Sequence, residues 1–296
     1  MDNNQLVIEI QKLIKNSIEN YFKKPKPRNH QERQISSVMT GLTTSMGTTF
    51  WEKLANFLAK DNGFRILYKQ DKKLLQPSPF PQDLRSELDN LKSLRKSKEQ
   101  KISMTECIER LRVVAKKINR NNLNYIDPPS GHGVDIYLIK DNIEYVFDLK
   151  ATHPNRGDGS RFSDQLLDWY CYRLSREPLA SIHTRIVIPF NPFLPQTWWQ
   201  SQGNKMYPLE EHHDIWVENE FWDFCSGKIN TWSLIKEAFI DLQKDQAFIN
   251  KYRQKFRNYL DNQFGKIISS KFLATASTTG TGTAFPNCFL AIAGCG

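Results

Sequence analysis

The chain has 296 residues, of which 39% are hydrophobic and 25% are charged, and its formal net charge is +9. These values are ordinary for a soluble globular protein of one or two domains. No window holds the roughly 18 consecutive apolar residues that a membrane span needs. Polar and acidic residues near the N-terminus argue against a signal peptide, so we expect a cytoplasmic protein.

The first part of the chain is predicted to be mainly helical. Apolar residues at helical spacing over residues 5–22 predict one amphipathic helix, which the basic, proline-containing residues 23–28 end. A second helical stretch opens near Thr49. Further on, a polar helical region is predicted over residues 82–118. Its basic residues 94–101 (LRKSKEQK) are expected to form a solvated helix face or a loop.

The sequence changes character at residues 127–133 (DPPSGHG), which are dense in residues typical of loops. Two β-rich runs follow, at residues 134–139 and 143–149, and the short polar segment between them indicates a hairpin. A helix is then predicted at residues 162–174. Later in the chain, a strand is predicted at 184–188 and helices are predicted at 220–225 and 232–243. This order predicts an α/β fold, a small mixed β-sheet flanked by helices with an N-terminal helical arm.

Three residues of the predicted hairpin stand out as a chemical centre: Asp135, Asp148 and Lys150. Side chains alternate across a strand, so Asp148 and Lys150 point to the same face. Asp135 begins the partner strand, and a hairpin places it beside the end of the second strand. Two carboxylates and one amine are therefore expected to converge at one edge of the sheet.

Hydrolysis of a phosphodiester needs groups of this kind. Carboxylate oxygens are ligands that Mg²⁺ accepts, and a lysine can orient or deprotonate the attacking water and offset charge in the transition state. The alternative is a solvated ion pair at a strand end, which is common. The apolar runs on either side of the acids favour the catalytic interpretation, because buried charges need partners.

This arrangement resembles the PD-(D/E)xK nuclease superfamily, with Val134-Asp135 in place of Pro-Asp and 148–150 (DLK) as the second half. Four further patches resemble type II restriction endonucleases, most nearly the TdeIII type. The list is 42–52 (LTTSMGTTFWE), 155–170 (NRGDGSRFSDQLLDWY), 188–193 (IPFNPF) and 220–227 (EFWDFCSG). The likeness covers roughly residues 36–242. Two features depart from it, the missing proline before Asp135 and the C-terminal tail.

The resemblance implies a restriction-endonuclease-like core and Mg²⁺-dependent cleavage of double-stranded DNA at a short, palindromic site. A homodimer is expected, because symmetric cutting of two strands mirrors a protein two-fold axis. In this superfamily an acidic residue from an early helix often joins the metal site, and Glu52 is the matching candidate beside Asp135 and Asp148. Its alternative role is structural, since a glutamate in a first turn is favoured by the helix dipole.

The chain is divided on this basis into three parts. Residues 1–126 form an N-terminal helical region, whose helix with Glu52 joins the core, and residues 127–273 form the nuclease core and C-terminal helices. Residues 274–296 are an uncharged tail rich in Thr, Gly and Ala, for which the sequence offers no function.

The segment after Lys150 is the candidate DNA-contacting loop. It places polar and basic side chains beside the metal site, and these suit contacts to phosphates or base edges. The candidates are Thr152, His153, Asn155, Arg156 and Arg161. An ordinary solvated loop is the alternative. The excess of 41 Lys and Arg over 32 Asp and Glu also favours a polyanionic partner.

Other motifs are assigned simpler roles. His212 and His213 lie next to acidic residues, but adjacent side chains point in opposite directions, so a loop or an interface is favoured over a transition-metal site. Trp198 and Trp199 fit either the core or stacking on DNA. The five cysteines lack a CxxC pair and have an odd count, which favours buried thiols over zinc ligands or disulfides.

Two rival functions remain open at this point. One is a repair, recombination or transposition nuclease with the same fold, and the other is a non-catalytic DNA-binding module. The intact set Asp135, Asp148 and Lys150 argues against the second.

Overall fold

The computed structural model describes residues 1–23, 50–150, 153–251 and 254. The chain divides into two compact units, one of Met1–Leu54 with Lys228–Gly296 and one of Ala55–Gly227. None of the described helices combines the length and the apolar character that crossing a bilayer would need. Residues 274–296 lie outside the described residues.

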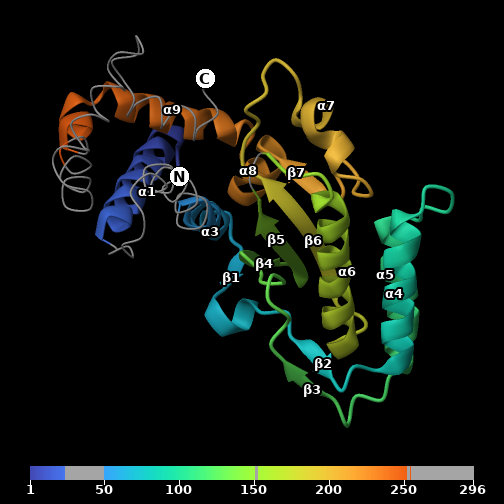
Figure 1. Ribbon diagram of the computed structural model, residues 1–296. Helices are drawn as coiled ribbons and strands as arrows, with labels where there is room; N and C mark the ends of the chain where they lie inside the picture. The colour runs from blue at the N-terminus through green and yellow to red at the C-terminus, as the bar shows by residue number, and fades with distance from the viewer. Residues whose placement is uncertain (24–49, 151–152, 252–253, 255–296) are drawn as a thin grey trace, which may run out of the picture. The chain divides into compact units, whose positions relative to one another are not determined.

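The second unit is built on a five-stranded mixed sheet (Figure 1). Its strands lie in the order β1 (Arg65–Leu67), β4 (Ile136–Lys140), β5 (Ile143–Leu149), β6 (Ser181–Ile188) and β7 (Ile215–Val217). The β1–β4 and β4–β5 pairs are antiparallel, whereas β5–β6 and β6–β7 are parallel. The predicted small mixed sheet flanked by helices is confirmed.

The β4–β5 hairpin has the two-residue turn that its sequence suits. Asp141 and Asn142 adopt positive φ angles of 52° and 60°. Turns with two such residues match the right-handed twist of the flanking strands, and Asp and Asn tolerate this conformation better than most side chains. The turn sets the register that pairs Ile136 with Phe147, and this register fixes which residues meet at the far end of the hairpin.

Helix α6 (Asp158–Arg176) connects the parallel strands β5 and β6 and covers one face of the sheet. Parallel neighbours cannot be joined by a tight turn, so a crossover of this kind is required. The helix begins four residues before the predicted start at residue 162. On its outer side pack α4 (Gln82–Lys96) and α5 (Met104–Lys117). The predicted helical region of residues 82–118 is therefore two helices, which separate within the basic stretch 94–101.

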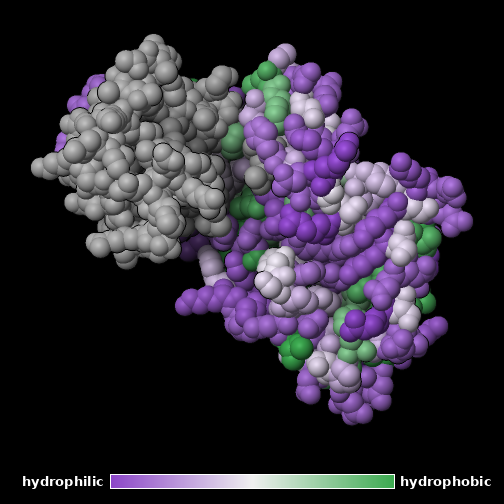
Figure 2. Space-filling view, viewed as in Figure 1, coloured by the Kyte–Doolittle hydropathy of each residue, from purple (hydrophilic) through white to green (hydrophobic). Residues whose placement is uncertain are grey.

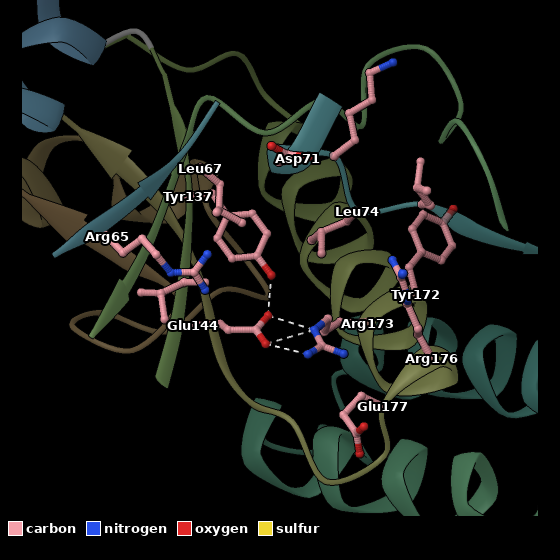
Figure 3. Close-up of a pocket in the computed structure, with 13 residues that line it drawn as sticks. Arg65, Leu67, Asp71, Leu74, Tyr137, Glu144, Tyr172, Arg173, Arg176 and Glu177 are labelled. Carbon is pink, nitrogen blue, oxygen red and sulfur yellow. Dashed lines mark hydrogen bonds and ion pairs between the residues drawn. The ribbon is translucent and has the colours of Figure 1, made fainter. Parts of the chain in front are cut away.

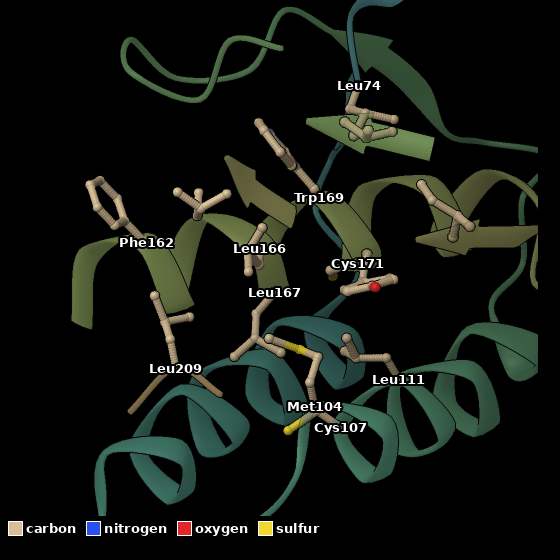
Figure 4. Packing of buried hydrophobic residues seen from close by; sticks show 14 of the residues in the cluster. Leu74, Met104, Cys107, Leu111, Phe162, Leu166, Leu167, Trp169, Cys171 and Leu209 are labelled. Carbon is tan, nitrogen blue, oxygen red and sulfur yellow. The ribbon is translucent and has the colours of Figure 1, made fainter. Parts of the chain in front are cut away.

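The three helices share one apolar core, shown in Figure 4. Leu166 and Leu167 of α6 are fully buried, as are Cys107 and Leu111 of α5. Burying a leucine side chain stabilises the fold by roughly 1.5–3 kcal/mol. The Ser103 hydroxyl caps α5 by accepting a hydrogen bond from the Glu106 amide at 3.1 Å. The packed core fixes α6 against the sheet.

The first turn of α6 approaches another part of the chain closely. A Cβ atom added to Gly159 would lie 2.4 Å from the main-chain carbon of Met206 and 2.5 Å from the carbonyl oxygen of Tyr207. Main-chain atoms cannot move aside as the end of a flexible side chain can. Glycine is therefore the residue that lets these two segments meet.

The remaining elements of this unit are short. Helix α8 (Asn219–Ser226) supplies Phe221 and Phe224, whose rings contact Phe147 of β5. The other elements are η2 (Lys69–Lys72), β2 (Gln76–Ser78), β3 (Asn124–Ile126), α7 (Trp198–Gln202) and η3 (Gly203–Lys205). Strands β2 and β3 pair antiparallel in a separate small sheet. Over α4–α6 the surface seen in Figure 2 is largely hydrophilic, with only small apolar patches.

The first unit contains α1 (Asn3–Lys23) packed against α9 (Thr231–Lys244). The predicted apolar stripe of α1 is confirmed, because Leu6, Ile10 and Ile14 are completely buried. Helix α3 (Glu52–Asp61) begins in this unit and continues into the second. Cys107, Cys171 and Cys225 are free and buried, as expected. Cys288 and Cys295 lie outside the described residues.

Candidate active site

The β4–β5 hairpin brings Asp135 to the end of β5. The Asp135 amide donates to the Phe147 carbonyl at 3.1 Å, and the Asp135 carboxylate Oδ2 accepts a hydrogen bond from the Leu149 amide at 2.8 Å. A side-chain oxygen of Asp135 thus takes part in the pairing of the two strands. The carboxylate is held by main chain on the strand that carries Asp148.

Asp148 lies at the centre of the group. It is only 4% exposed, and its Oδ2 receives Lys150 Nζ at 2.5 Å and Gln165 Nε2 at 2.8 Å. Asp148 and Lys150 share one face of the strand, as the alternation of side chains predicts. The Lys150 ammonium also lies 5.5 Å from the centre of the Phe162 ring. One amine and one amide therefore converge on a single buried oxygen.

The two carboxylates influence each other electrostatically. Burial raises the pKa of Asp148, the Lys150 ammonium lowers it, and the negative charge of Asp135 raises it, so that the pKa rises from 3.8 to about 7. A buried carboxylate beside a second one is costly unless a cation offsets it. Hard oxygen donors crowded in this way suit a divalent cation such as Mg²⁺. The donor chemistry of Asp135 and Asp148 fits the expected metal.

The roles predicted for Glu52 and Thr152 are not tested by the structure. Glu52 is the first residue of α3, in the first turn of that helix, and belongs to the first unit. Its role as a metal ligand stays a prediction. Thr152 lies outside the described residues, so its predicted contact with DNA stays a prediction as well.

The candidate DNA-contacting segment leads from β5 into α6. His153, Asn155, Arg156 and Arg161 are all exposed. The His153 ring packs edge-on against Phe193 at 5.0 Å. The Asn155 amide donates to Asp158 Oδ2 at 2.7 Å, which orders the start of the helix. Exposure leaves these side chains accessible to a polyanion.

Arg161 is the best-defined cation of that segment. Its guanidinium pairs with Asp158 at 2.8 Å, and its side chain is 68% exposed. Arg161 also borders a cavity of about 640 Å³, between α4, α6 and the loop containing His132. Exposed ion pairs of this type contribute little to stability, so Arg161 can exchange Asp158 for a phosphate at small energetic cost.

Two residues near the candidate site, Gln165 and His132, were not predicted from the sequence. Gln165 was grouped with the core residues of α6, yet its amide donates to Asp148. The signal was present, because Gln165 stands among apolar residues on a buried face, and a buried amide needs a polar partner. His132, three residues before Asp135, pairs with Asp168 of α6 at 2.9 Å through Nε2, and this contact raises the pKa of His132.

A second cluster of possible metal ligands occurs among the described residues. One ligand atom each of Glu210, His213 and Asp214 lies within 4.8 Å of the others. However, the fully buried Arg95 guanidinium already binds both Glu210 and Asp214. The guanidinium supplies the positive charge that an ion would supply, so we interpret this cluster as an ion-pair network.

His212 is turned away from that cluster, toward Glu220, to which its Nδ1 bonds at 2.5 Å. The two histidines therefore have different partners, as their adjacency predicts. The neighbouring tryptophans also differ. Trp198 is 1% exposed and belongs to the core, whereas Trp199 is half-buried.

Figure 3 shows another cavity, of about 500 Å³, at the opposite end of the hairpin. There Glu144 accepts hydrogen bonds from Tyr137 and from the Arg173 guanidinium, the latter at 2.5 to 3.0 Å. Glu144 precedes Asp148 by four residues, about 13 Å along a strand. Arg173 balances the charge of Glu144, and neither Asp135 nor Asp148 lines this cavity, which is therefore distinct from the carboxylate pair.

A mixed sheet with a central hairpin and a crossover helix on one face is consistent with a restriction-endonuclease-like core. A family model described as "Type II restriction endonuclease, HinfI" matches residues 3–243. The chain belongs to this family of site-specific deoxyribonucleases. Comparisons with curated proteins and with solved structures gave no match.

The family answers the question of function class that the sequence left open. It supports a restriction endonuclease over a repair nuclease or a non-catalytic binding module. The family also implies a divalent metal and DNA as the substrate. The narrower resemblance to the TdeIII type is not confirmed by the match.

Proposed function

We propose that Asp135, Asp148 and Lys150 form the cutting centre of this restriction endonuclease and that its metal is Mg²⁺. The observation that carries the proposal is the convergence of Lys150 Nζ and the Gln165 amide on Asp148, a buried carboxylate next to Asp135. A structural ion pair would need neither the second carboxylate nor the burial.

Each residue has a distinct role in this proposal. Asp135 and Asp148 would hold the cation, with Glu52 as a third candidate ligand. When bound, Mg²⁺ supplies positive charge to the scissile phosphate and favours ionisation of the attacking water. Lys150 orients that water and offsets negative charge as the phosphorus–oxygen bond breaks. Gln165 fixes the orientation of the Asp148 carboxyl group through its hydrogen bond.

The substrate is double-stranded DNA with a short recognition sequence. We assign phosphate or base contacts to Thr152, His153, Asn155, Arg156 and Arg161. A homodimer acting in the cytoplasm, on a palindromic site, fits the need to cut both strands symmetrically. Four sequence patches resemble TdeIII-type enzymes, and we propose that this chain is most closely related to that type among the restriction endonucleases.

The decisive experiment is digestion of a sequenced plasmid by the full chain with Mg²⁺, followed by mapping of the ends. We expect a discrete set of fragments whose ends share one short sequence. Asp135→Ala and Asp148→Ala should each abolish cutting while the protein stays folded. Asp83→Ala, which replaces an exposed carboxylate of α4, is the matched control and should cut normally. Full activity in excess chelator, or normal cutting by Asp148→Ala, would disprove the assignment.

A further inference from the structure

We propose that Lys72, 63 residues before Asp135 in the chain, is a positioning residue for the Asp135 carboxylate. The inference rests on the proposed metal centre and adds a residue to it. Lys72 is the last residue of η2 and is half-buried. Its Nζ donates to the main-chain carbonyl of Asp135 at 2.9 Å. An ammonium group from another element thus reaches the main chain of a catalytic acid.

The strand pairing is irregular at Asp135. The register pairs Phe147 with Ile136, but the Asp135 amide also donates to the Phe147 carbonyl. Two successive residues are thus matched to one partner residue, as in a β-bulge. Bulges bend a strand and redirect side chains, and they are enriched next to active sites.

Beside this irregularity the Asp135 side chain also accepts a hydrogen bond from the partner strand. The Leu149 amide donates to Asp135 Oδ2 rather than to a carbonyl of the opposite strand. The Asp135 carbonyl accepts its hydrogen bond from Lys72 Nζ. A main-chain carbonyl deprived of a partner at a half-buried position is unfavourable. Lys72 therefore stabilises the main chain that carries the Asp135 carboxylate.

Element η2 is itself anchored to the loop that leads to Asp135. Lys73 Nζ pairs with Asp127 Oδ2 at 2.7 Å, and Gln70 Nε2 donates to Asp127 Oδ1 at 3.3 Å. The same short element thus contacts the first residue of the loop, Asp127, and the residue at its end, Asp135. This double attachment suits a role in holding the loop in one conformation.

The test compares Lys72→Met with the wild-type full chain. Methionine keeps an unbranched apolar stem but cannot donate to the carbonyl. The readout is Mn²⁺ affinity of the DNA-free protein, measured by calorimetry, because it reports the carboxylates without the chemical step. We expect about 10-fold weaker Mn²⁺ binding, the lower end of the effect of outer residues that orient metal ligands. Lys72→Arg, which retains a donor, should recover most of the affinity.

Lys69→Met is the matched control, because Lys69 lies in the same element but is exposed. It should bind Mn²⁺ like the wild type. Thermal unfolding of every variant checks that the protein is folded. If Lys72→Met does not fold, Lys72→Gln replaces it, and we expect this variant to bind Mn²⁺ more than about 3-fold less tightly than the wild type.

Two results would overturn the proposal. Unchanged Mn²⁺ binding by Lys72→Met would show that Lys72 does not position the Asp135 carboxylate, and tighter binding would show that its positive charge mainly opposes the cation. Unchanged Mn²⁺ binding with weaker binding of a cognate duplex in Ca²⁺, and a smaller salt dependence, would make Lys72 a phosphate contact instead. Absence of Mn²⁺ binding by the wild type is a different outcome, because it would refute the metal centre itself.

Discussion

Replacing Asp148 by Asn should stabilise the metal-free protein at neutral and alkaline pH. Burial and the neighbouring Asp135 raise the pKa of Asp148 to about 7, so above that pH the folded chain holds a buried carboxylate that Lys150 balances only in part. Asparagine has nearly the same shape and keeps an oxygen that can accept the Gln165 amide. The substitution removes the charge and leaves the packing in place.

The size of the effect follows from the pKa of Asp148. Because the folded-state pKa is raised, the stability associated with this group is fully present below pH 3.8 and is lost as the pH rises through about 7. A rise of about three pH units corresponds to at most about 4 kcal/mol. Relaxation around the ion pair reduces this value. Between pH 5 and pH 8 we therefore expect the free energy of unfolding of Asp148→Asn to increase by about 1–3 kcal/mol relative to that of the wild type.

The assay is urea unfolding in chelator at pH 5 and pH 8, with the free energy of unfolding compared between wild type and variant at each pH. Asp83→Asn, at an exposed position in the first turn of α4, controls for general effects of charge. A difference that does not change with pH, or one that moves against the Asn variant as the pH rises, would refute the reasoning. Mn²⁺ at pH 8 should stabilise the wild type more than the variant.

Three further predictions concern catalysis and binding. Lys150→Ala should bind the cognate duplex in Ca²⁺ nearly as well as the wild type, but its single-turnover cleavage rate should fall at least ~100-fold. Lys150→Arg should also lose cleavage, because a guanidinium stays protonated and planar. Gln165→Leu should lower the cleavage rate about 10-fold or more, since it removes a hydrogen bond to a charged acceptor; near-normal cleavage would show that this contact is only structural. Arg161→Ala should weaken duplex binding in a filter assay and reduce the salt dependence of binding more than Lys98→Ala does. Lys98 is an exposed lysine between α4 and α5, and equal effects of the two substitutions would show that Arg161 does not contact DNA.

Local chemistry made the core of the site predictable. The β4–β5 hairpin has strong β-formers on both strands and a turn that favours positive φ, so its pairing follows from neighbouring residues. Convergence of Asp135 with Asp148 and Lys150 then follows from the alternation of side chains. The long amphipathic helices α1 and α9 were similarly clear, because their apolar spacing persists over several turns.

Features that depend on distant residues were not predictable. Strands β1 and β7 have three residues each, too few for a periodic signal, and they are strands because the central sheet offers them a partner. The attachment of Lys72 to Asp135 joins residues 63 positions apart. Helix α1, near the start of the chain, packs against α9, which lies beyond residue 230. The predicted division of the chain at residue 126 did not anticipate this contact.

The close approach at Gly159 limits how this enzyme can diverge. Helix α6 carries Gln165, which contacts Asp148, and Asp168, which contacts His132, so its placement affects the surroundings of both acids. A single methyl group at Gly159 would push the helix away from the main chain of Met206 and Tyr207. The exposed segment around Arg156 can therefore change without moving the helix, whereas Gly159 cannot be enlarged. The contact that aligns α6 with this main chain thus leaves sequence change to the solvent-facing side of the helix.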